Sequence, residues 1–133
     1  MKIDHVALWR LKVPLYEPYN LSLVALSELD SIVAEIRDTD GRSGIGDCTV
    51  IPGYTPETGD GAWRFCSEHA ARLPGMEIAA AKRSFDGFRA GDPHAVSVLQ
   101  VALEMLEANP LLDAPLVDTR VPVLAPVNAK DHR

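Results

Sequence analysis

Residues 31–50 read SIVAEIRDTDGRSGIGDCTV, and this stretch decides the fold. Ser31 to Arg37 is rich in β-branched residues, and the polar segment after it ends in Asp40-Gly41. An Asp-Gly pair favours the positive φ angles of a tight hairpin turn. A further strand is expected from about Gly44 to Val50. The sequence therefore predicts two neighbouring antiparallel strands joined at Asp38 to Gly41.

The segment before this hairpin predicts another strand, from about Lys2 to Val13. Apolar and basic side chains alternate along its second half, with Trp9, Leu11 and Val13 on one face and Arg10 and Lys12 on the other. This period of two is typical of a half-buried strand. Pro14 and Pro18 interrupt it, so residues 15–27 are expected to form a long loop with apolar content.

After Ile51 the hydrophobic period changes, which predicts helices. Thr55-Pro56-Glu57 is typical of a helix start, with a hydroxyl cap, a proline and an acid in the first turn. The apolar stripes of the first two helices consist of Trp63, Cys66, Ala70 and Leu73, and of Ile78, Ala81, Phe85 and Phe88. Asp92-Pro93 begins a third helix that is apolar on most sides, so it is expected to need more cover than the other elements provide.

Four prolines and one apolar stretch, Val121 to Ala125, mark the last part of the chain. That stretch is apolar on both faces, as in a strand buried within an α/β layer. The expected fold is α+β: a three-stranded antiparallel meander followed by a three-helix bundle over residues 1–110. Residues 111–133 are expected to form a linker and the first strand of a β/α barrel that is otherwise missing.

Composition excludes several classes of partner. The net charge of -6 argues against nucleic acid, whose binding depends on basic residues that neutralise phosphates. No apolar run approaches the roughly 18 residues of a membrane span, and the first residues indicate a strand rather than a signal peptide. A cytoplasmic protein is therefore expected. Cys48 and Cys66 are expected to be reduced, partly buried thiols.

The residues alone do not indicate a catalytic or metal centre. The string Gly44-Ile45-Gly46-Asp47 lacks the third glycine and the following helix of a dinucleotide-binding motif. No two of the four histidines are three or four residues apart, so metal-ligand spacing is absent. Most carboxylates are expected at caps, turns and exposed strand positions. No catalytic residue, metal ligand or cofactor is therefore assigned to this chain.

The order of these elements resembles the N-terminal domain of the enolase superfamily, in particular its mandelate racemase and muconate lactonizing enzyme branches. The residues that carry the resemblance are Val13-Pro14-Leu15 with Pro18-Tyr19, Asp40-Gly41 with Gly44-Ile45-Gly46-Asp47, Pro52-Gly53-Tyr54-Thr55-Pro56-Glu57, and Val121-Pro122-Val123. The likeness covers almost the whole chain.

The resemblance implies a division of labour. In such enzymes a β/α barrel supplies the acid-base groups and the ligands of Mg²⁺, which stabilises the enolate formed when a proton leaves the carbon beside a carboxylate. The N-terminal domain supplies two loops that close over the barrel mouth. Here these loops would be Leu15 to Leu26 and Val50 to Thr55. The pocket-facing candidates are Tyr19, Asn20, Ile51 and Tyr54.

The resemblance thus implies a capping and specificity domain of a Mg²⁺-dependent racemase or cycloisomerase, truncated or made separately and inactive by itself. Its expected partners are the barrel, a small carboxylate substrate and a second copy of the chain, bound through the third helix and Val121 to Ala125. Two alternatives stay open. One is a free-standing module that binds a small carboxylate between the two loops, and the other is a self-associating structural remnant.

Overall fold

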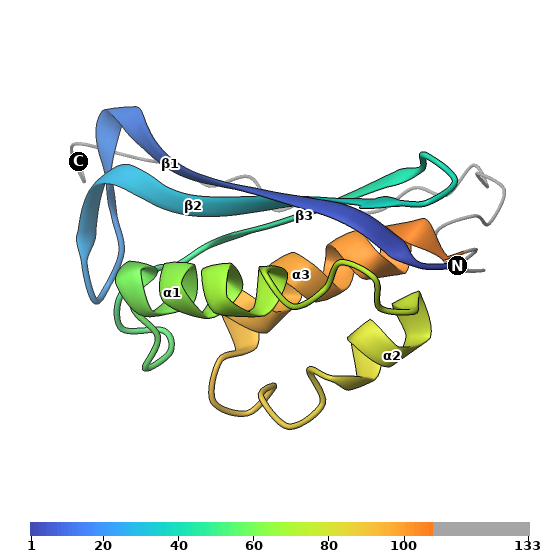
Figure 1. Cartoon of the computed structure of the whole chain (residues 1–133). Helices are drawn as coiled ribbons and strands as arrows, with labels where there is room; N and C mark the ends of the chain where they lie inside the picture. The colour runs from blue at the N-terminus through green and yellow to red at the C-terminus, as the bar shows by residue number, and fades with distance from the viewer. Residues whose placement is uncertain (108–133) are drawn as a thin grey trace, which may run out of the picture.

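The computed structural model describes residues 1–107 of the chain. Three strands come first, namely β1 (Ile3–Asn20), β2 (Ala25–Asp38) and β3 (Ser43–Thr49). Three helices follow, namely α1 (Gly59–Ala70), α2 (Ile78–Arg83) and α3 (Pro93–Leu106). The strands form one sheet in the order β1-β2-β3, and the helices lie on one side of it (Figure 1). The predicted α+β fold, an antiparallel meander followed by helices, is confirmed.

The hairpin between β2 and β3 forms where the sequence predicts it. The two strands pair without a register shift, from Ser31 opposite Thr49 to Arg37 opposite Ser43. The buried carboxylate of Asp38 accepts hydrogen bonds from the backbone N–H groups of Asp40 and Arg42, each at 2.9 Å. These bonds organise the turn from within the chain, as an aspartate at the start of a tight turn commonly does.

The hairpin between β1 and β2 is much longer than predicted. Pairing continues past Pro14 and, after a register shift, includes Tyr19 opposite Leu26 and Asn20 opposite Ala25. The long loop expected over residues 15–27 is therefore wrong, because only residues 21–24 separate the two strands. β1 tolerates its prolines because it is an edge strand of this sheet. A proline there can have its missing N–H on the side that does not pair with β2, so no hydrogen bond of the ladder is lost.

The helices cover one face of the sheet, and it is not the face that the alternation in β1 suggests. The buried residues of β2 are Ile32, Ala34 and Ile36, and their partners in β1 are Arg10, Leu8 and Val6. Trp9, Leu11 and Val13 lie on the opposite face and are 43 to 44% exposed. The period of two is right, but the expected burial of these three side chains is wrong, because β1 is partly apolar on both faces and β2 decides which one is covered.

The first two helices differ from the prediction at their ends. α1 begins at Gly59, because the hydroxyl of Thr58 accepts the N–H of Gly61 at 3.1 Å and so caps the helix. The predicted start at Thr55-Pro56-Glu57 is therefore wrong. α2 has six residues and ends at Arg83, so Phe85 and Phe88 of the predicted apolar stripe lie beyond its end.

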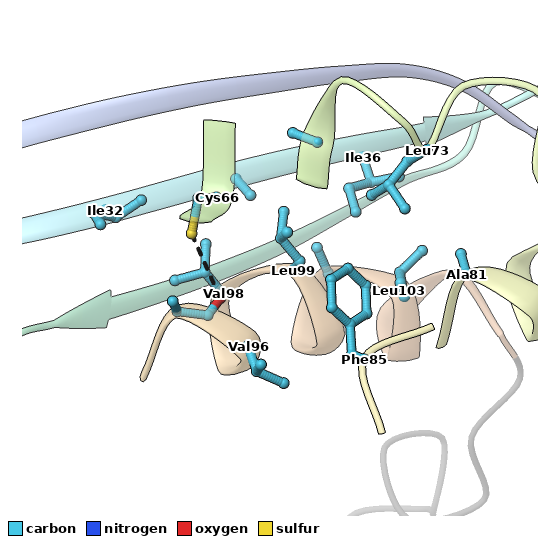
Figure 2. Close-up of a cluster of buried hydrophobic side chains, with 14 of the residues drawn as sticks. Ile32, Ile36, Cys66, Leu73, Ala81, Phe85, Val96, Val98, Leu99 and Leu103 are labelled. Atoms are coloured by element: carbon cyan, nitrogen blue, oxygen red, sulfur yellow. Dashed lines mark hydrogen bonds between the residues drawn. The ribbon is translucent and has the colours of Figure 1, made fainter. Parts of the chain in front are cut away.

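The core lies between the sheet and α3 (Figure 2). The buried residues of α3 are Ala95, Val96, Val98, Leu99, Ala102, Leu103 and Leu106. Phe85, which follows α2, is fully buried and packs in the same cluster. The large apolar side chains of α3 that stay exposed are Val101 and Met105. The expectation that α3 needs extra cover on most sides is therefore wrong, because the sheet and the other helices already enclose it.

β3 and α3 approach each other closely at two glycines. A Cβ atom added to Gly46 would overlap the backbone oxygen of Val98 and lie 2.9 Å from the backbone nitrogen of Ala102. A Cβ atom added to Gly44 would overlap the backbone oxygen of Ala102. Side chains at both positions would hold the helix away from the strand, so close packing explains the Gly-x-Gly pattern that fails as a nucleotide-binding motif.

Several predictions lie outside the described residues. They are the domain boundary at residue 110, the linker and barrel strand over residues 111–133, and the strand at Val121 to Ala125. In the described range, 1–107, none of the helices has the length and apolar character needed to cross a membrane.

Candidate functional site

The two segments predicted to act as lids meet at one end of the sheet. The first is the end of the β1–β2 hairpin, Leu15 to Leu26, and the second is the segment after β3, Val50 to Thr55. The side chain of Leu23 lies 3.4 Å from the position of a Cβ atom built on Gly53, so the two segments are in contact. Figure 1 shows the hairpin end and the start of α1 at the same end of the molecule. We call this surface the lid end.

The lid end carries large side chains that are open to solvent. Tyr16 is fully exposed, Leu23 is 65% exposed and Tyr54 is 59% exposed. Of the other predicted site residues, Tyr19 and Asn20 are exposed and Ile51 is half-buried. Exposed apolar and aromatic side chains that gather at one place commonly mark a binding surface. The structure thus brings the predicted segments together, although the first is a hairpin and not a loop.

A cluster of charged side chains holds the base of the hairpin to α1. Arg10 of β1 donates from Nε to Asp30 Oδ1 at 2.9 Å and from Nη2 to Asp30 Oδ2 at 2.7 Å. Its Nη1 lies 2.7 Å from a carboxylate oxygen of Asp60, in the first turn of α1. Lys12 Nζ lies 2.9 Å from Asp30 Oδ2. The hydrogen bonds from Arg10, and to a lesser extent from Lys12, lower the pKa of Asp30 to about 2 against the opposing effect of burial.

A buried carboxylate holds the second segment to α3. Glu57 accepts the backbone N–H of His94 on Oε2 and that of Ala95 on Oε1, both at 3.0 Å. The ring atom Nδ1 of His94 lies 2.6 Å from the same Oε2, and the hydroxyl of Thr55 lies 3.2 Å from it. Asp92, the N-cap residue of α3, makes no capping hydrogen bond with its side chain. Glu57 therefore caps α3 from a distant part of the chain.

The charge of Glu57 is stabilised by this arrangement. Burial alone would raise the pKa of its carboxyl group, but the N–H groups of Ala95 and His94 and the His94 side chain outweigh that effect. The pKa of Glu57 is consequently below its ordinary value. An ionised carboxylate at a helix N-terminus also interacts favourably with the helix dipole.

Sequence analysis missed both anchors of the lid end. Arg10 is placed there with Lys12 on one face of the first strand, and Glu57 is assigned to the first turn of the first helix. One signal could have identified Glu57. Thr58 is a second cap candidate and Asp60 follows it in the first turn, so α1 has a complete start without Glu57. No comparable signal links Arg10 to Asp30, because that contact depends on the register of β1 and β2.

Both cysteines are buried and unpaired with each other. Burial raises the pKa of Cys48 to about 11 and that of Cys66 to about 12. The thiol of Cys66 donates to the backbone oxygen of Ala95 at 3.5 Å (Figure 2). The prediction of reduced thiols agrees with this arrangement, although their burial is more complete than expected.

We expect the native chain to react with a thiol reagent such as DTNB at least about 100-fold more slowly than the unfolded chain at pH 8. A pKa near 11 lowers the thiolate fraction about 100-fold relative to an ordinary thiol, and burial blocks access as well. The reaction is followed by absorbance with and without denaturant. Complete labelling of the native chain within minutes would contradict the burial of these residues.

A metal site does not fit the described part of the chain. Among residues 1–107, no three His, Cys, Asp or Glu side chains lie together in a way that could hold a metal ion. Hard cations such as Mg²⁺ are bound by several oxygen ligands, usually from carboxylates and water. The Mg²⁺ that the resemblance implies is therefore not assigned to these residues.

Comparison with solved structures shows the same fold in larger proteins. A dipeptide epimerase from Cytophaga hutchinsonii, complexed with Mg and the dipeptide D-Ala-L-Val, has 27% identity and a TM-score of 0.72, with 80% of this chain and 30% of that chain covered. A member of the enolase superfamily from Roseovarius nubinhibens has 25% identity and a TM-score of 0.64. The match covers 77% of this chain and 29% of that chain. A mandelate racemase/muconate lactonizing protein from Herpetosiphon aurantiacus has 19% identity and a TM-score of 0.67. This match also covers 77% of this chain and 29% of that chain.

The chain therefore has the fold of the N-terminal domain of enolase-superfamily proteins. Within that superfamily, the matched structures include dipeptide epimerases and a racemase of N-succinyl Arg/Lys from Bacillus cereus. The chain spans about 30% of the length of these structures. No family model matches the sequence, and no curated protein matches it.

Proposed function

We propose that this chain is the capping and specificity domain of a racemase, epimerase or cycloisomerase that removes a proton from the carbon beside a carboxylate. The observation that carries the proposal is the contact between Leu23 and Gly53, which brings both lid segments together as one exposed surface. The partner would be a β/α barrel, whose catalytic groups lie at the mouth that the lid end covers.

In this proposal the lid end excludes water and contacts the part of the substrate that identifies it. Tyr16, Tyr19 and Tyr54 offer apolar rings that cover a substrate and hydroxyl groups that can hydrogen-bond to it. A lid also needs a firm base if it is to select among substrates. The ion pairs of Arg10 and the buried Glu57 supply such bases for the two segments.

The likeness to dipeptide epimerases supports a small carboxylate of about dipeptide size as the substrate. Such a molecule has a reacting carbon next to a carboxylate or amide carbonyl and side chains that project away from it. The barrel would act on the carbon, and the lid end would contact a projecting side chain. Chemistry and specificity would then belong to different domains, as is common in barrel enzymes that close a lid.

We expect the 133-residue chain by itself neither to bind Mg²⁺ at micromolar concentration nor to exchange the α-proton of a dipeptide with solvent deuterium. The described residues offer no set of metal ligands, and the proposal assigns proton transfer to the barrel. Calorimetry tests the first point, and proton NMR of L-Ala-L-Glu in D₂O tests the second against a buffer control. Catalysed exchange would show that the proposed division of labour is incorrect.

In a complete enzyme that contains this domain, we expect Tyr19→Ala and Ile51→Ala to change the ranking of substrates by kcat/KM. Removal of a side-chain contact is worth about 1–3 kcal/mol of discrimination, or roughly 10- to 200-fold between two substrates. Proton exchange of a minimal substrate should change less, because the lid does not transfer the proton.

Val101→Ala is a matched control for this experiment, since Val101 is an exposed apolar residue on α3 and is not part of the lid end. It should leave the ranking of substrates as it is. If the two lid variants also leave that ranking unchanged, the assignment of the lid end to specificity is refuted.

A further inference from the structure

A small cavity lies between the end of α1 and the segments on either side of α2. Its volume is about 210 Å³, and the residues that line it are His69, Arg72, Leu73, Met76, Ser84 and Phe88. Leu73 is buried and Met76 is half-buried, whereas Arg72 and Phe88 are exposed. The cavity therefore has an apolar inner wall and opens to solvent at its rim. We call it the α1–α2 cavity.

The imidazole ring of His69 is held in place by aromatic side chains. It stacks on the ring of Phe65 with the centroids 4.1 Å apart, and it lies edge-to-face with Phe88 at 4.8 Å. The fully buried ring of Phe85 lies 5.6 Å from it. Aromatic contacts of this kind favour particular orientations of the rings. His69 therefore presents its ring nitrogens at a defined place in the wall of the cavity.

Two side chains that line the cavity have unused hydrogen-bond donors. Within residues 1–107, neither the guanidinium group of Arg72 nor the imidazole ring of His69 forms a hydrogen bond or an ion pair. The third polar side chain, Ser84, donates its hydroxyl hydrogen to the backbone oxygen of Ala81 at 2.6 Å. Of the described residues in the lining, none is acidic. The cavity therefore offers a ligand positive charge and free donors.

The protonation of His69 also suits an anion. Burial lowers the pKa of His69, and the charge of Arg72 lowers it further, whereas Glu68 of α1 and Asp92 before α3 act in the opposite direction. The ring is therefore mostly neutral at neutral pH and can donate from one nitrogen. An anion bound beside it would favour the protonated form. Anion binding should consequently become tighter as the pH falls.

We propose that the α1–α2 cavity binds a small organic anion, namely a carboxylate attached to an aromatic ring or a branched apolar group. Arg72 and His69 would donate to the carboxylate, and charge-assisted hydrogen bonds of this kind are strong. Leu73, Met76 and Phe88 would cover the apolar part. An apolar cavity of about 150 Å³ can hold a benzene molecule, so the volume here suits a ring with one carboxylate. Inorganic phosphate would leave the apolar wall uncovered.

The α1–α2 cavity is separate from the lid end. α1 begins at the lid end with Gly59, and His69 lies ten residues further along, or about 15 Å along the helix axis. Figure 1 shows the start of α1 near the end of the β1–β2 hairpin and its other end towards α2. A ligand in the cavity would therefore be held apart from a substrate at the lid end. Its binding does not depend on the proposed function.

NMR titration of the isotope-labelled chain of 133 residues with benzoate tests the proposal. We expect saturable shifts of the amide signals of His69, Arg72 and Phe88, with a Kd of about 0.1 to 1 mM for so small a ligand. Benzyl alcohol, which has the ring without the charge, should bind at least about tenfold more weakly. With benzoate bound, the ring proton signal of His69 should report a higher pKa than without it, because the anion lies beside the ring.

Arg72→Gln should raise the Kd for benzoate at least about tenfold, because it removes the charged donor. Arg64→Gln is the matched control, since Arg64 is an exposed arginine on α1 that does not line the cavity. This control should leave the Kd unchanged. Because both arginines are exposed, circular dichroism should show that both variants remain folded.

A chain that shows no saturable binding up to about 10 mM benzoate would overturn the proposal. So would binding that Arg72→Gln leaves unchanged, or equal affinity for inorganic phosphate, because the cavity would then not recognise an organic anion through Arg72. Shifts confined to Tyr19, Tyr54 and their neighbours would place the ligand at the lid end. That result would refute this site while it supported the lid end as a binding surface.

Discussion

Gly46→Ala should destabilise the chain by about 3 kcal/mol or more, because it adds a methyl group where the structure leaves no space for one. The added Cβ would overlap the backbone oxygen of Val98 and would also crowd the backbone nitrogen of Ala102. Both neighbours are main-chain atoms of α3, so no side-chain rotation can relieve the overlap. The helix would have to move away from β3 and would loosen its contacts with the core.

Urea or guanidinium denaturation, followed by circular dichroism, measures this change in the free energy of unfolding. Gly87→Ala is the matched control, because a Cβ at Gly87 meets no atom within 4 Å. It should change stability by no more than about 0.5 kcal/mol. A Gly46→Ala variant as stable as the wild type would mean that β3 and α3 do not approach as closely as described.

Glu57→Gln should lower the free energy of unfolding by about 2 kcal/mol at neutral pH. The substitution replaces a charged acceptor by a neutral amide and introduces N–H groups beside the donors of His94 and Ala95. Because Glu57 links the second lid segment to α3, the variant should also increase amide hydrogen exchange at Thr55 and His94. Glu68→Gln, an exposed change on α1, is the matched control and should have little effect.

The effect of Glu57→Gln should depend on pH in a defined direction. The pKa of Glu57 is lower in the folded chain than its ordinary value, so the native state favours the ionised form. Its contribution to stability is then complete above the ordinary carboxyl pKa of about 4.3 and is lost as the pH falls further. The difference between wild type and variant should be largest at neutral pH and should shrink on acidification. A difference that grows on acidification would contradict this description of the site.

The local features of the fold could be predicted from sequence because neighbouring residues determine them. The Asp38 to Gly41 turn, the antiparallel pair β2 and β3, and the change to helices after Ile51 all follow from turn chemistry and hydrophobic period. The resemblance to the N-terminal domain of the enolase superfamily has the same basis, since it depends on short motifs in a characteristic order. The two lid segments could be named for this reason before their geometry was known.

Features that depend on contacts between distant residues required the tertiary structure. β1 carries apolar side chains on both faces, so its own pattern could not show whether Leu8 or Trp9 faces the helices; the register with Ile32 to Ile36 of β2 decides it. Glu57 fits a helix start by its neighbours, but α3, almost forty residues further along the chain, binds its carboxylate. Burial and hydrogen bonding depend on the three-dimensional environment of a side chain. Local sequence therefore determined which elements form, and packing decided which face is covered and which charged groups hold the lid end in place.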